Sequence, residues 1–194
     1  MRIGVYCGSF NPVHKGHIRI ANECLDSKLV DVIFIIPTGN YWNKNDLMDL
    51  DKRISLLRYY EDRRIRVAEQ YSDYQYTCQI FKQLEKDYPY DEKVLILGAD
   101  NIVKFDEWKE YQYLLRYDFI IIKRDDLDRT YIENRMKELG KDNYQILDID
   151  NIDISSTFIR ENLDDYDKIK DLIDPHVYRF LIMERMIENA APNN

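Results

Sequence analysis

Short, strongly apolar runs alternate with longer amphipathic stretches along the chain. Val32–Ile36 and Phe119–Ile122 are apolar at every position and show no period-two alternation. Strands with this pattern are typical of a parallel sheet that helices cover on both faces. The segments expected to form strands, the last two from weaker patterns, are Arg2–Cys7, Asp31–Pro37, Lys93–Leu97, Asp118–Ile122, Ile65–Val67 and Gln145–Ile149.

Helical periodicity fills the intervals between these runs. The expected helices are His17–Ser27, Asp51–Asp62, Thr77–Asp87, Asn101–Arg116, Tyr131–Leu139 and a C-terminal set within Thr157–Ile187. Repetition of strand and helix predicts an α/β fold, a Rossmann-like doubly wound parallel sheet with helices on both faces and a C-terminal helical segment. Ligands of such sheets bind beyond the carboxyl ends of the strands. The site is therefore expected in the loops after Cys7, Ile36, Leu97 and Ile149.

Length and composition indicate one compact unit. The 194 residues, 45% of them hydrophobic, can bury a sizeable core, and no repeat or Gly/Ser linker divides them. We expect a single domain over residues 1–188 and a flexible tail over residues 189–194. The apolar runs are far shorter than a membrane span, and the three cysteines lack the spacing of a metal site or a disulfide framework. These features predict a cytoplasmic protein without a membrane partner, and they are compatible with a homo-oligomer.

The net charge narrows the choice of partners. A net charge of −8 and a pI of about 5.0 argue against non-specific binding of nucleic acid, which depends on clustered Lys and Arg. An acidic protein can still hold a small polyanion such as a nucleoside triphosphate. It then needs local hydrogen-bond donors and a divalent cation that screens the phosphate charge.

The segment Gly8–His17 combines glycine, proline and two histidines within ten residues, directly after an apolar run. Gly8 allows the backbone to approach a ligand closely, and a helix that starts near His14 presents unpaired N–H groups to an anion. His14 and His17, three positions apart, share one helical face. A zinc site is the alternative, but it needs further ligands, and the only other histidine is His176. The segment therefore favours phosphate binding.

A second candidate anion site is the segment Ile154–Arg160. Its Ser and Thr residues are suited to cap a helix, and Arg160 lies within the first turns of that helix. Alone, the segment is an ordinary helix cap. Together with Gly8–His17 it predicts a triphosphate held between two helix starts and a cationic fork.

These two segments, which read GSFNPVHKGH and ISSTFIR, resemble the signatures of one nucleotidyltransferase superfamily. That superfamily contains nicotinate mononucleotide adenylyltransferases, phosphopantetheine adenylyltransferases and small cytidylyltransferases. Within it, Gly98–Asn101 followed by Trp108, and Gln75–Thr77 before a helix, resemble the bacterial nicotinate mononucleotide adenylyltransferases. Arg53 at a helix start and the length of the chain agree with that group.

The resemblance implies adenylyl transfer from ATP, carried with Mg²⁺, to nicotinate mononucleotide, with pyrophosphate as the second product. It implies His17 at the α-phosphate, His14 at the adjoining phosphates and Arg160 at the leaving pyrophosphate, with no metal ligand from the protein. The ATP-binding residues that it implies are Gly8, Ser9, Phe10, His14, His17, Gly98, Asp100, Ser155, Ser156, Thr157 and Arg160. The implied mononucleotide-binding residues are Lys44, Thr77 and Trp108. Asp100 is expected to hold a ribose hydroxyl, and Trp108 to offer its face to the pyridine ring.

Two positions depart from the pattern of these enzymes. The first turn usually carries two glycines, where this chain has Cys7-Gly8, and the second loop usually reads Pro-Pro-His-Lys, where this chain has Asn40–Lys44. The loop lysine is kept and the loop histidine is not. The alternatives are a sister transferase that uses nicotinamide mononucleotide, phosphopantetheine or CTP, a class I aminoacyl-tRNA synthetase core, and a nucleotide-binding sensor without catalysis. The short, acidic chain argues against the synthetase core.

Overall fold

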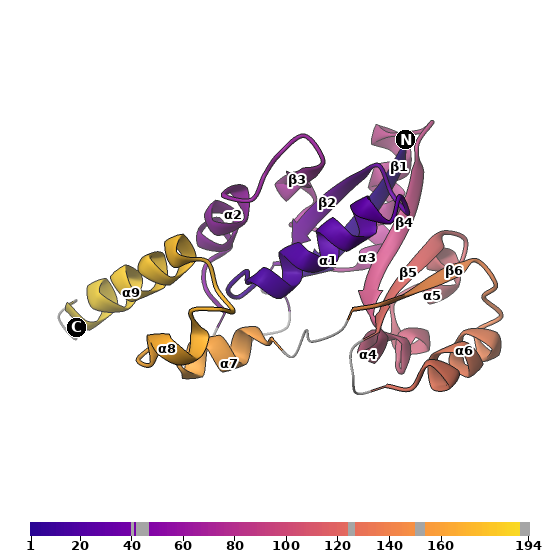
Figure 1. Ribbon diagram of the computed structural model, residues 1–194. Coiled ribbons are helices and arrows are strands. Elements are labelled where there is room, and N and C mark those ends of the chain that lie inside the picture. The colour runs from indigo at the N-terminus through magenta and orange to yellow at the C-terminus, as the bar shows by residue number, and fades with distance from the viewer. Residues whose placement is uncertain (40, 42–46, 124–126, 150–153, 191–194) are drawn as a thin grey trace.

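A six-stranded, fully parallel sheet forms the centre of the computed structural model, which describes residues 1–39, 41, 47–123, 127–149 and 154–190 (Figure 1). The strands lie in the order β3-β2-β1-β4-β5-β6. Their bounds are β1 (Arg2–Gly8), β2 (Val32–Pro37), β3 (Ile65–Val67), β4 (Glu92–Gly98), β5 (Asp118–Lys123) and β6 (Tyr144–Asp148). Each expected strand is present, with its ends displaced by at most one residue. The predicted doubly wound fold is confirmed.

Helices connect the strands and continue beyond the last one. The longer ones are α1 (Lys15–Asp26), α2 (Leu50–Arg58), α3 (Thr77–Asp87), α6 (Arg129–Glu138) and α9 (Pro175–Ala190). The shorter ones are η1 (Glu69–Tyr71), α4 (Ala99–Ile102), η2 (Phe105–Glu107), α5 (Tyr111–Leu114), α7 (Ser156–Glu161) and α8 (Tyr166–Ile169). In the described part of the chain, no helix has both the length and the apolar character that crossing a membrane requires.

Three expectations about helices were wrong in detail. The single helix expected over Asn101–Arg116 is instead three short pieces, and Glu110, just before the last of them, has a left-handed backbone with φ of 51°. Helix α2 ends at Arg58, four residues before the expected Asp62. Helix α9 continues to Ala190, three residues beyond the expected end of the C-terminal set at Ile187, and residues 191–194 lie outside the described part.

Alternate residues of the strands enter two separate hydrophobic layers. One layer joins Ile33, Ile35 and Ile96 to α1, α2 and the C-terminal helices, and the other joins Val5, Phe34 and Leu95 to helices α3 to α6. Helices α1 and α3 accordingly lie on opposite faces of the sheet (Figure 1). Burial on both faces explains why the central strands are apolar at every position.

The order of the strands determines where the site can form. The chain leaves β1 toward β2 on one side, whereas β4 lies on the other side of β1. The carboxyl ends of β1 and β4, at Gly8 and Gly98, therefore flank the point at which the direction of winding reverses. This is the position at which open α/β sheets bind ligands.

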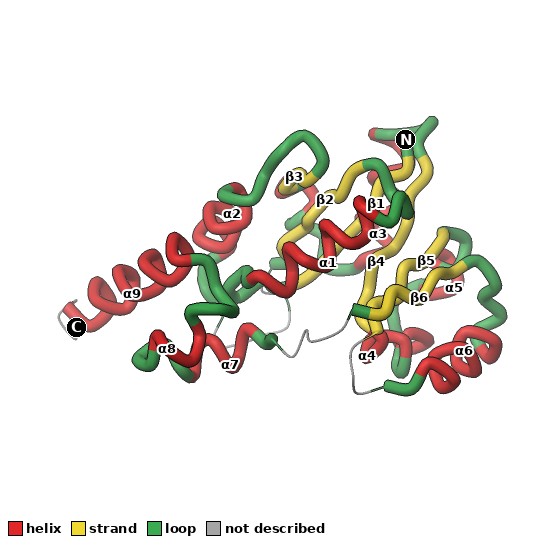
Figure 2. The backbone as a smooth tube through the Cα atoms, in the orientation of Figure 1, coloured by secondary structure: helices red, strands yellow, loops and turns green. Residues whose placement is uncertain are grey.

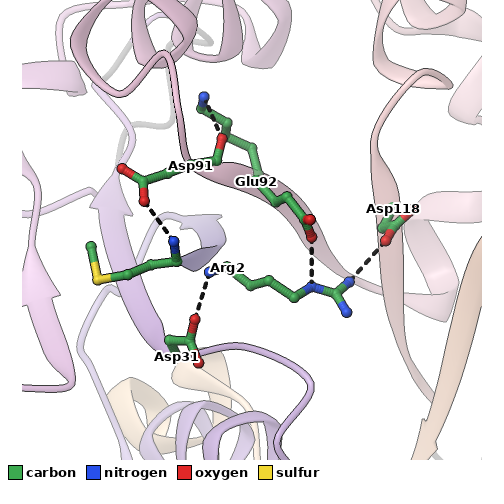
Figure 3. A network of polar contacts seen from close by, with 7 residues as sticks. Arg2, Asp31, Asp91, Glu92 and Asp118 are labelled. Atoms are coloured by element: carbon green, nitrogen blue, oxygen red, sulfur yellow. Dashed lines mark hydrogen bonds and ion pairs between the residues drawn. The ribbon is translucent and has the colours of Figure 1, made fainter.

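Ion pairs join the opposite, amino ends of the strands (Figure 3). The guanidinium of Arg2 contacts Glu92 at the start of β4, at 3.3 Å, and Asp118 at the start of β5, at 2.8 Å. The N-terminal ammonium contacts Asp91 at 2.7 Å, and the backbone N–H of Arg2 donates to Asp31 at 2.7 Å. Pairs with this much solvent exposure stabilise the fold only modestly. They place carboxylates at the edge of the sheet that lies away from Gly8 and Gly98.

The C-terminal helices pack against α1 and α2 (Figure 2). The backbone N–H of Lys15, at the start of α1, donates to the carbonyl of Leu172 at 3.0 Å. Just after the end of α2, the ring of Tyr59 stacks on His176 with centroids 4.5 Å apart. Near the start of α2, Lys52 pairs with Glu184 of α9. The segment beyond residue 162 therefore supports the two helices that lie closest to the end of β1.

Close packing around β1 leads to a prediction for Gly4. A β-carbon at this position would lie 2.8 Å from the Cδ1 atoms of both Ile33 and Ile96. Overpacking a fully buried site costs about 1–3 kcal/mol, so Gly4→Ala should lower the free energy of unfolding in urea by that amount. The matched control is Val103→Ala, because Val103 is exposed. Equal stability of the two variants would contradict this account of the sheet.

Candidate active site

The turn after β1 has an unusual conformation that its side chains hold in place. Phe10 adopts φ of 47°, which bulky residues rarely do, and its ring is buried edge-on against Tyr6 and His17. A β-carbon on Gly8 would lie 3.1 Å from the Phe10 ring. Glycine at position 8 therefore allows Phe10 to fold back beneath the turn.

The two histidines of this turn form a stacked pair. Their ring centroids are 3.6 Å apart, with planes inclined by 24°. The backbone N–H of His14 donates to Nδ1 of His17 at 3.2 Å. Because Nδ1 accepts this bond, the proton of a neutral His17 ring resides on Nε2, which makes Nε2 a hydrogen-bond donor. His14 is only 2% exposed and lies behind His17.

A cavity of about 170 Å³ opens between the ends of β1 and β4. Seven of the residues expected to bind ATP or the mononucleotide line it, together with Tyr6, Cys7 and Asn101. The seven are Gly8, Phe10, His17, Thr77, Gly98, Asp100 and Trp108. Burial raises the pKa of the Cys7 thiol to about 12, so this side chain stays neutral and contributes no nucleophile.

A second cavity of about 540 Å³ adjoins the first. The two share Thr77, Asp100, Asn101 and Trp108, and the second also reaches Thr38 after β2. It is further lined by Gln75, Tyr76, Lys104, Glu107 and Lys109. Trp108 is half-buried and follows η2 in an extended conformation, with its ring 5.1 Å from that of Phe105. Two adjoining cavities at the switch point can accept two ligands side by side.

Helix α7 contacts the histidine turn directly, although about 145 residues separate them in the sequence. The hydroxyl of Ser156 donates to the carbonyl of Pro12 at 2.9 Å, and Nη1 of Arg160 donates to the carbonyl of Asn11 at 2.6 Å. A second guanidinium nitrogen of Arg160 lies 3.3 Å from the hydroxyl of Thr157. The two motif segments thus lie together, as expected, but Arg160 borders the turn and does not line either of the two cavities.

The remaining candidate residues occupy less central places. Ser155 caps α7 by accepting a hydrogen bond from the backbone N–H of Phe158 at 3.0 Å. Thr157 is exposed on the same helix. Ser9 takes part through its carbonyl, which accepts from Arg53 at 2.7 Å. Lys44 lies outside the described residues.

Arg53 is the most deeply buried cation near the site. It is 1% exposed and donates from Nη1 to the carbonyls of Ser9 and Thr38, at 2.7 and 2.9 Å, and from Nε to the carbonyl of Met48 at 2.9 Å. Burial lowers the pKa of its guanidinium. The side-chain oxygen of Asn11 accepts from the backbone N–H of Met48 at 3.0 Å, which joins the same segments a second time.

Sequence reasoning assigned no role to several of these residues. Asn101 and Thr38 follow the ends of β4 and β2, so the rule about strand ends could have included both. Arg53 precedes Leu56 and Leu57 by three and four positions, so it stands as a charge within the apolar stripe of α2. The sequence did not indicate that Lys104 and Lys109 line a cavity, because their positions depend on the unexpected break in the helix. Within the described residues, no group of three or more His, Cys, Asp or Glu side chains is arranged to hold a metal ion.

Comparisons with known proteins agree with this geometry. Among curated proteins, the chain is 28% identical over 192 residues to one of Flavobacterium psychrophilum named "Probable nicotinate-nucleotide adenylyltransferase", across 93% of this chain and 96% of the relative. A protein of the same name from Endomicrobium trichonymphae is 30% identical over 196 residues, across 93% of this chain and 96% of that one.

Solved structures and a family model extend the comparison. The nicotinic acid mononucleotide adenylyltransferase of Plasmodium falciparum, complexed with NaAD, has the same fold, with a TM-score of 0.79 at 21% identity over 96% of this chain and 97% of that chain. The model of the cytidylyltransferase-like family matches residues 5–162, a range that contains both motif segments. The chain therefore belongs to the cytidylyltransferase-like family, and the curated relatives described above are nicotinate-nucleotide adenylyltransferases by name.

Proposed function

We propose that this protein transfers the adenylyl group of ATP to nicotinate mononucleotide, a step of NAD biosynthesis. The observation that carries the proposal is the pair of adjoining cavities at the switch point, with His17 lining one of them and Thr77 and Trp108 lining both. The names of the curated relatives support the same activity. Residues 1–188 would act as one nucleotidyltransferase domain in the cytoplasm, as a single chain or as a homo-oligomer.

The reaction needs alignment and charge neutralisation more than a protein nucleophile. A phosphate oxygen of the mononucleotide attacks the α-phosphorus of ATP, the bond from that phosphorus to the bridging oxygen breaks, and pyrophosphate leaves with the electron pair. Donors fixed before the reaction stabilise the charge that develops on the phosphate oxygens. Mg²⁺ would enter with ATP, since this ion binds mainly phosphate oxygens and water.

The roles of the motif residues follow from where their donors lie. His17 would donate from Nε2 to the α-phosphate, because its Nδ1 already accepts from the backbone of His14. The burial of His14 favours a role in supporting that ring over extensive contact with the adjoining phosphates. Arg160 would bind the leaving pyrophosphate with the guanidinium N–H groups that Asn11 and Thr157 do not use, beside the hydroxyls of Ser155, Ser156 and Thr157. Lys44 would assist from its loop.

The mononucleotide would occupy the larger cavity. Trp108 offers an aromatic face to a pyridine ring, and Thr77 offers a hydroxyl to its carboxylate. Lys104 and Lys109 line the same cavity, where Asp100 and Glu107 balance their charge. The two ammonium groups would therefore favour an acid over an amide through direct contact with its carboxylate. Asp100 would accept a hydrogen bond from a ribose hydroxyl where the two cavities meet.

A panel of acceptors tests the proposal. With Mg²⁺ and ATP, pyrophosphate release should be fastest with nicotinate mononucleotide. Its kcat/KM should exceed that of nicotinamide mononucleotide because the hydroxyl of Thr77 and the ammonium groups of Lys104 and Lys109 are available to bind a carboxylate in this cavity. CTP and phosphopantetheine should give little product. Turnover with phosphopantetheine but with neither pyridine mononucleotide would contradict the assignment, and binding of ATP without pyrophosphate release would indicate a sensor.

His17→Ala tests the donor at the α-phosphate. Removal of one preorganised donor should lower kcat on the order of a hundredfold, with little effect on the thermal midpoint of unfolding. The control is His176→Ala, which removes an exposed imidazole stacked on Tyr59, away from both cavities. Unchanged turnover of the His17 variant would refute its role.

Gly98→Ala tests the placement of Asp100. A β-carbon on Gly98 would lie 2.3 Å from Oδ1 of Asp100, so the carboxylate must move away. The expected result is a higher KM for ATP by about tenfold, the equivalent of one charge-assisted hydrogen bond, while the fold is retained. Kinetics with ATP as the varied substrate measure it, and an unaltered KM would remove Asp100 from the nucleotide site.

A further inference from the structure

Arg53 contacts three segments that are separate in the sequence. From the first turns of α2 its guanidinium reaches the histidine turn at Ser9, the loop after β2 at Thr38, and Met48 just before its own helix. All three partners are backbone carbonyls, so the bonds depend on the path of the main chain and not on the side chains that it carries. Arg53, which binds these carbonyls, is itself only 1% exposed.

The shape of the guanidinium matches this arrangement. Nη1 carries two N–H groups, and one carbonyl accepts from each, while the single N–H of Nε serves the third. A lysine ammonium presents its donors from one point at the end of a flexible chain and cannot reproduce a planar fork. The site therefore requires arginine and not merely a positive charge.

Two of the carbonyls that Arg53 binds belong to neighbouring segments that border different cavities of the proposed site. Ser9 directly follows Gly8, which lines the cavity that contains His17, whereas Thr38 lines the larger cavity. Thr38 also donates its backbone N–H to the carbonyl of Gly8 at 2.9 Å. Arg53 lines neither cavity, but it binds a backbone carbonyl next to each of them.

Burying the guanidinium of Arg53 between two loops costs free energy. Removing the charge from water costs several kcal/mol. Among the described residues no carboxylate forms an ion pair with Arg53, and the attraction of Asp49 only partly opposes the effect of burial, which lowers the pKa of the guanidinium. Within the described part of the chain, its hydrogen bonds go to carbonyl oxygens. The three hydrogen bonds fix the loops relative to each other, and a site in which two ligands must react in line requires such fixed positions.

We propose that Arg53 is a positioning residue for adenylyl transfer, which fixes the histidine turn relative to the loop after β2 so that the attacking phosphate and the α-phosphorus are aligned. It acts through His17 and the backbone and does not touch the reacting atoms. This inference rests on the proposed function and adds a residue that couples the two substrate sites.

The test compares Arg53→Lys, which keeps the charge, and Arg53→Gln, which keeps one donor group, with Arg58→Gln. Arg58 lies on the same helix, is exposed, and pairs with Glu69 at 2.6 Å, so it serves as the matched control. Thermal unfolding is recorded for each variant, and kinetics are measured well below the lowest midpoint. If Arg53→Gln does not fold, Arg53→Lys carries the comparison.

Both Arg53 variants should lower kcat about tenfold to a hundredfold, the range expected when reacting groups are misplaced by about 1 Å. In the His17→Ala background the same Arg53→Lys change should cost much less, because the two residues act together. A purely structural role would lower the midpoint of unfolding but leave kcat and both KM values of the folded enzyme equal to those of Arg58→Gln. That result, or full additivity with His17→Ala, would overturn the inference.

One further measurement separates this inference from the proposed activity. Calorimetric titration with the Mg²⁺ complex of α,β-methylene ATP needs no acceptor and no turnover. Arg53→Lys should weaken this binding several-fold relative to the wild-type chain, even if the wild-type protein proves inactive with nicotinate mononucleotide. Equal affinities of the two proteins would overturn the role of Arg53, whatever the acceptor.

Discussion

The histidine turn depends on two arginines that bind its backbone from two different helices. Arg53 donates to the carbonyl of Ser9 from α2, and Arg160 donates to the carbonyl of Asn11 from α7. Both bonds are charge-assisted, which makes them stronger than bonds between neutral groups. Phe10, between them, keeps a backbone conformation that it would rarely adopt in isolation. The geometry of the imidazole pair is therefore set by contacts that come from both halves of the chain.

Much of the fold could be predicted because the sheet is covered on both faces. Strands of this kind need apolar residues at every position, and Val32–Ile36 and Phe119–Ile122 fulfil that requirement visibly. The helix expected over Asn101–Arg116 could not be predicted correctly in the same way. Its aromatic residues have helical spacing, but Phe105 packs into the core while Trp108 turns toward the cavities, so tertiary contacts override the local pattern.

The site was only partly visible in the sequence. The histidine segment pointed to His17, and the resemblance to the bacterial nicotinate mononucleotide adenylyltransferases pointed to Gly98 and Asp100; all three line the cavity. The sequence did not reveal that His14 lies behind His17, since burial within a turn depends on Phe10 and on the distant α7. Arg53 was noted for its place at a helix start, but its three carbonyl partners, which lie on two loops, leave no trace in a pattern of side chains.

The packing of the C-terminal helices changes which part of the chain should be regarded as the enzyme. The family model ends at residue 162, yet Leu172 bonds to the start of α1, and His176 and Glu184 contact α2, the helix that carries Arg53. The residues after 162 make up about a sixth of the chain. Those that the structure describes contribute no candidate ligand-binding group, but they pack against the helices from which the site is assembled. Substitutions in these C-terminal helices would change the rigidity of α1 and α2. Relatives with the same motifs could therefore differ in turnover without any change in the residues that contact the substrates.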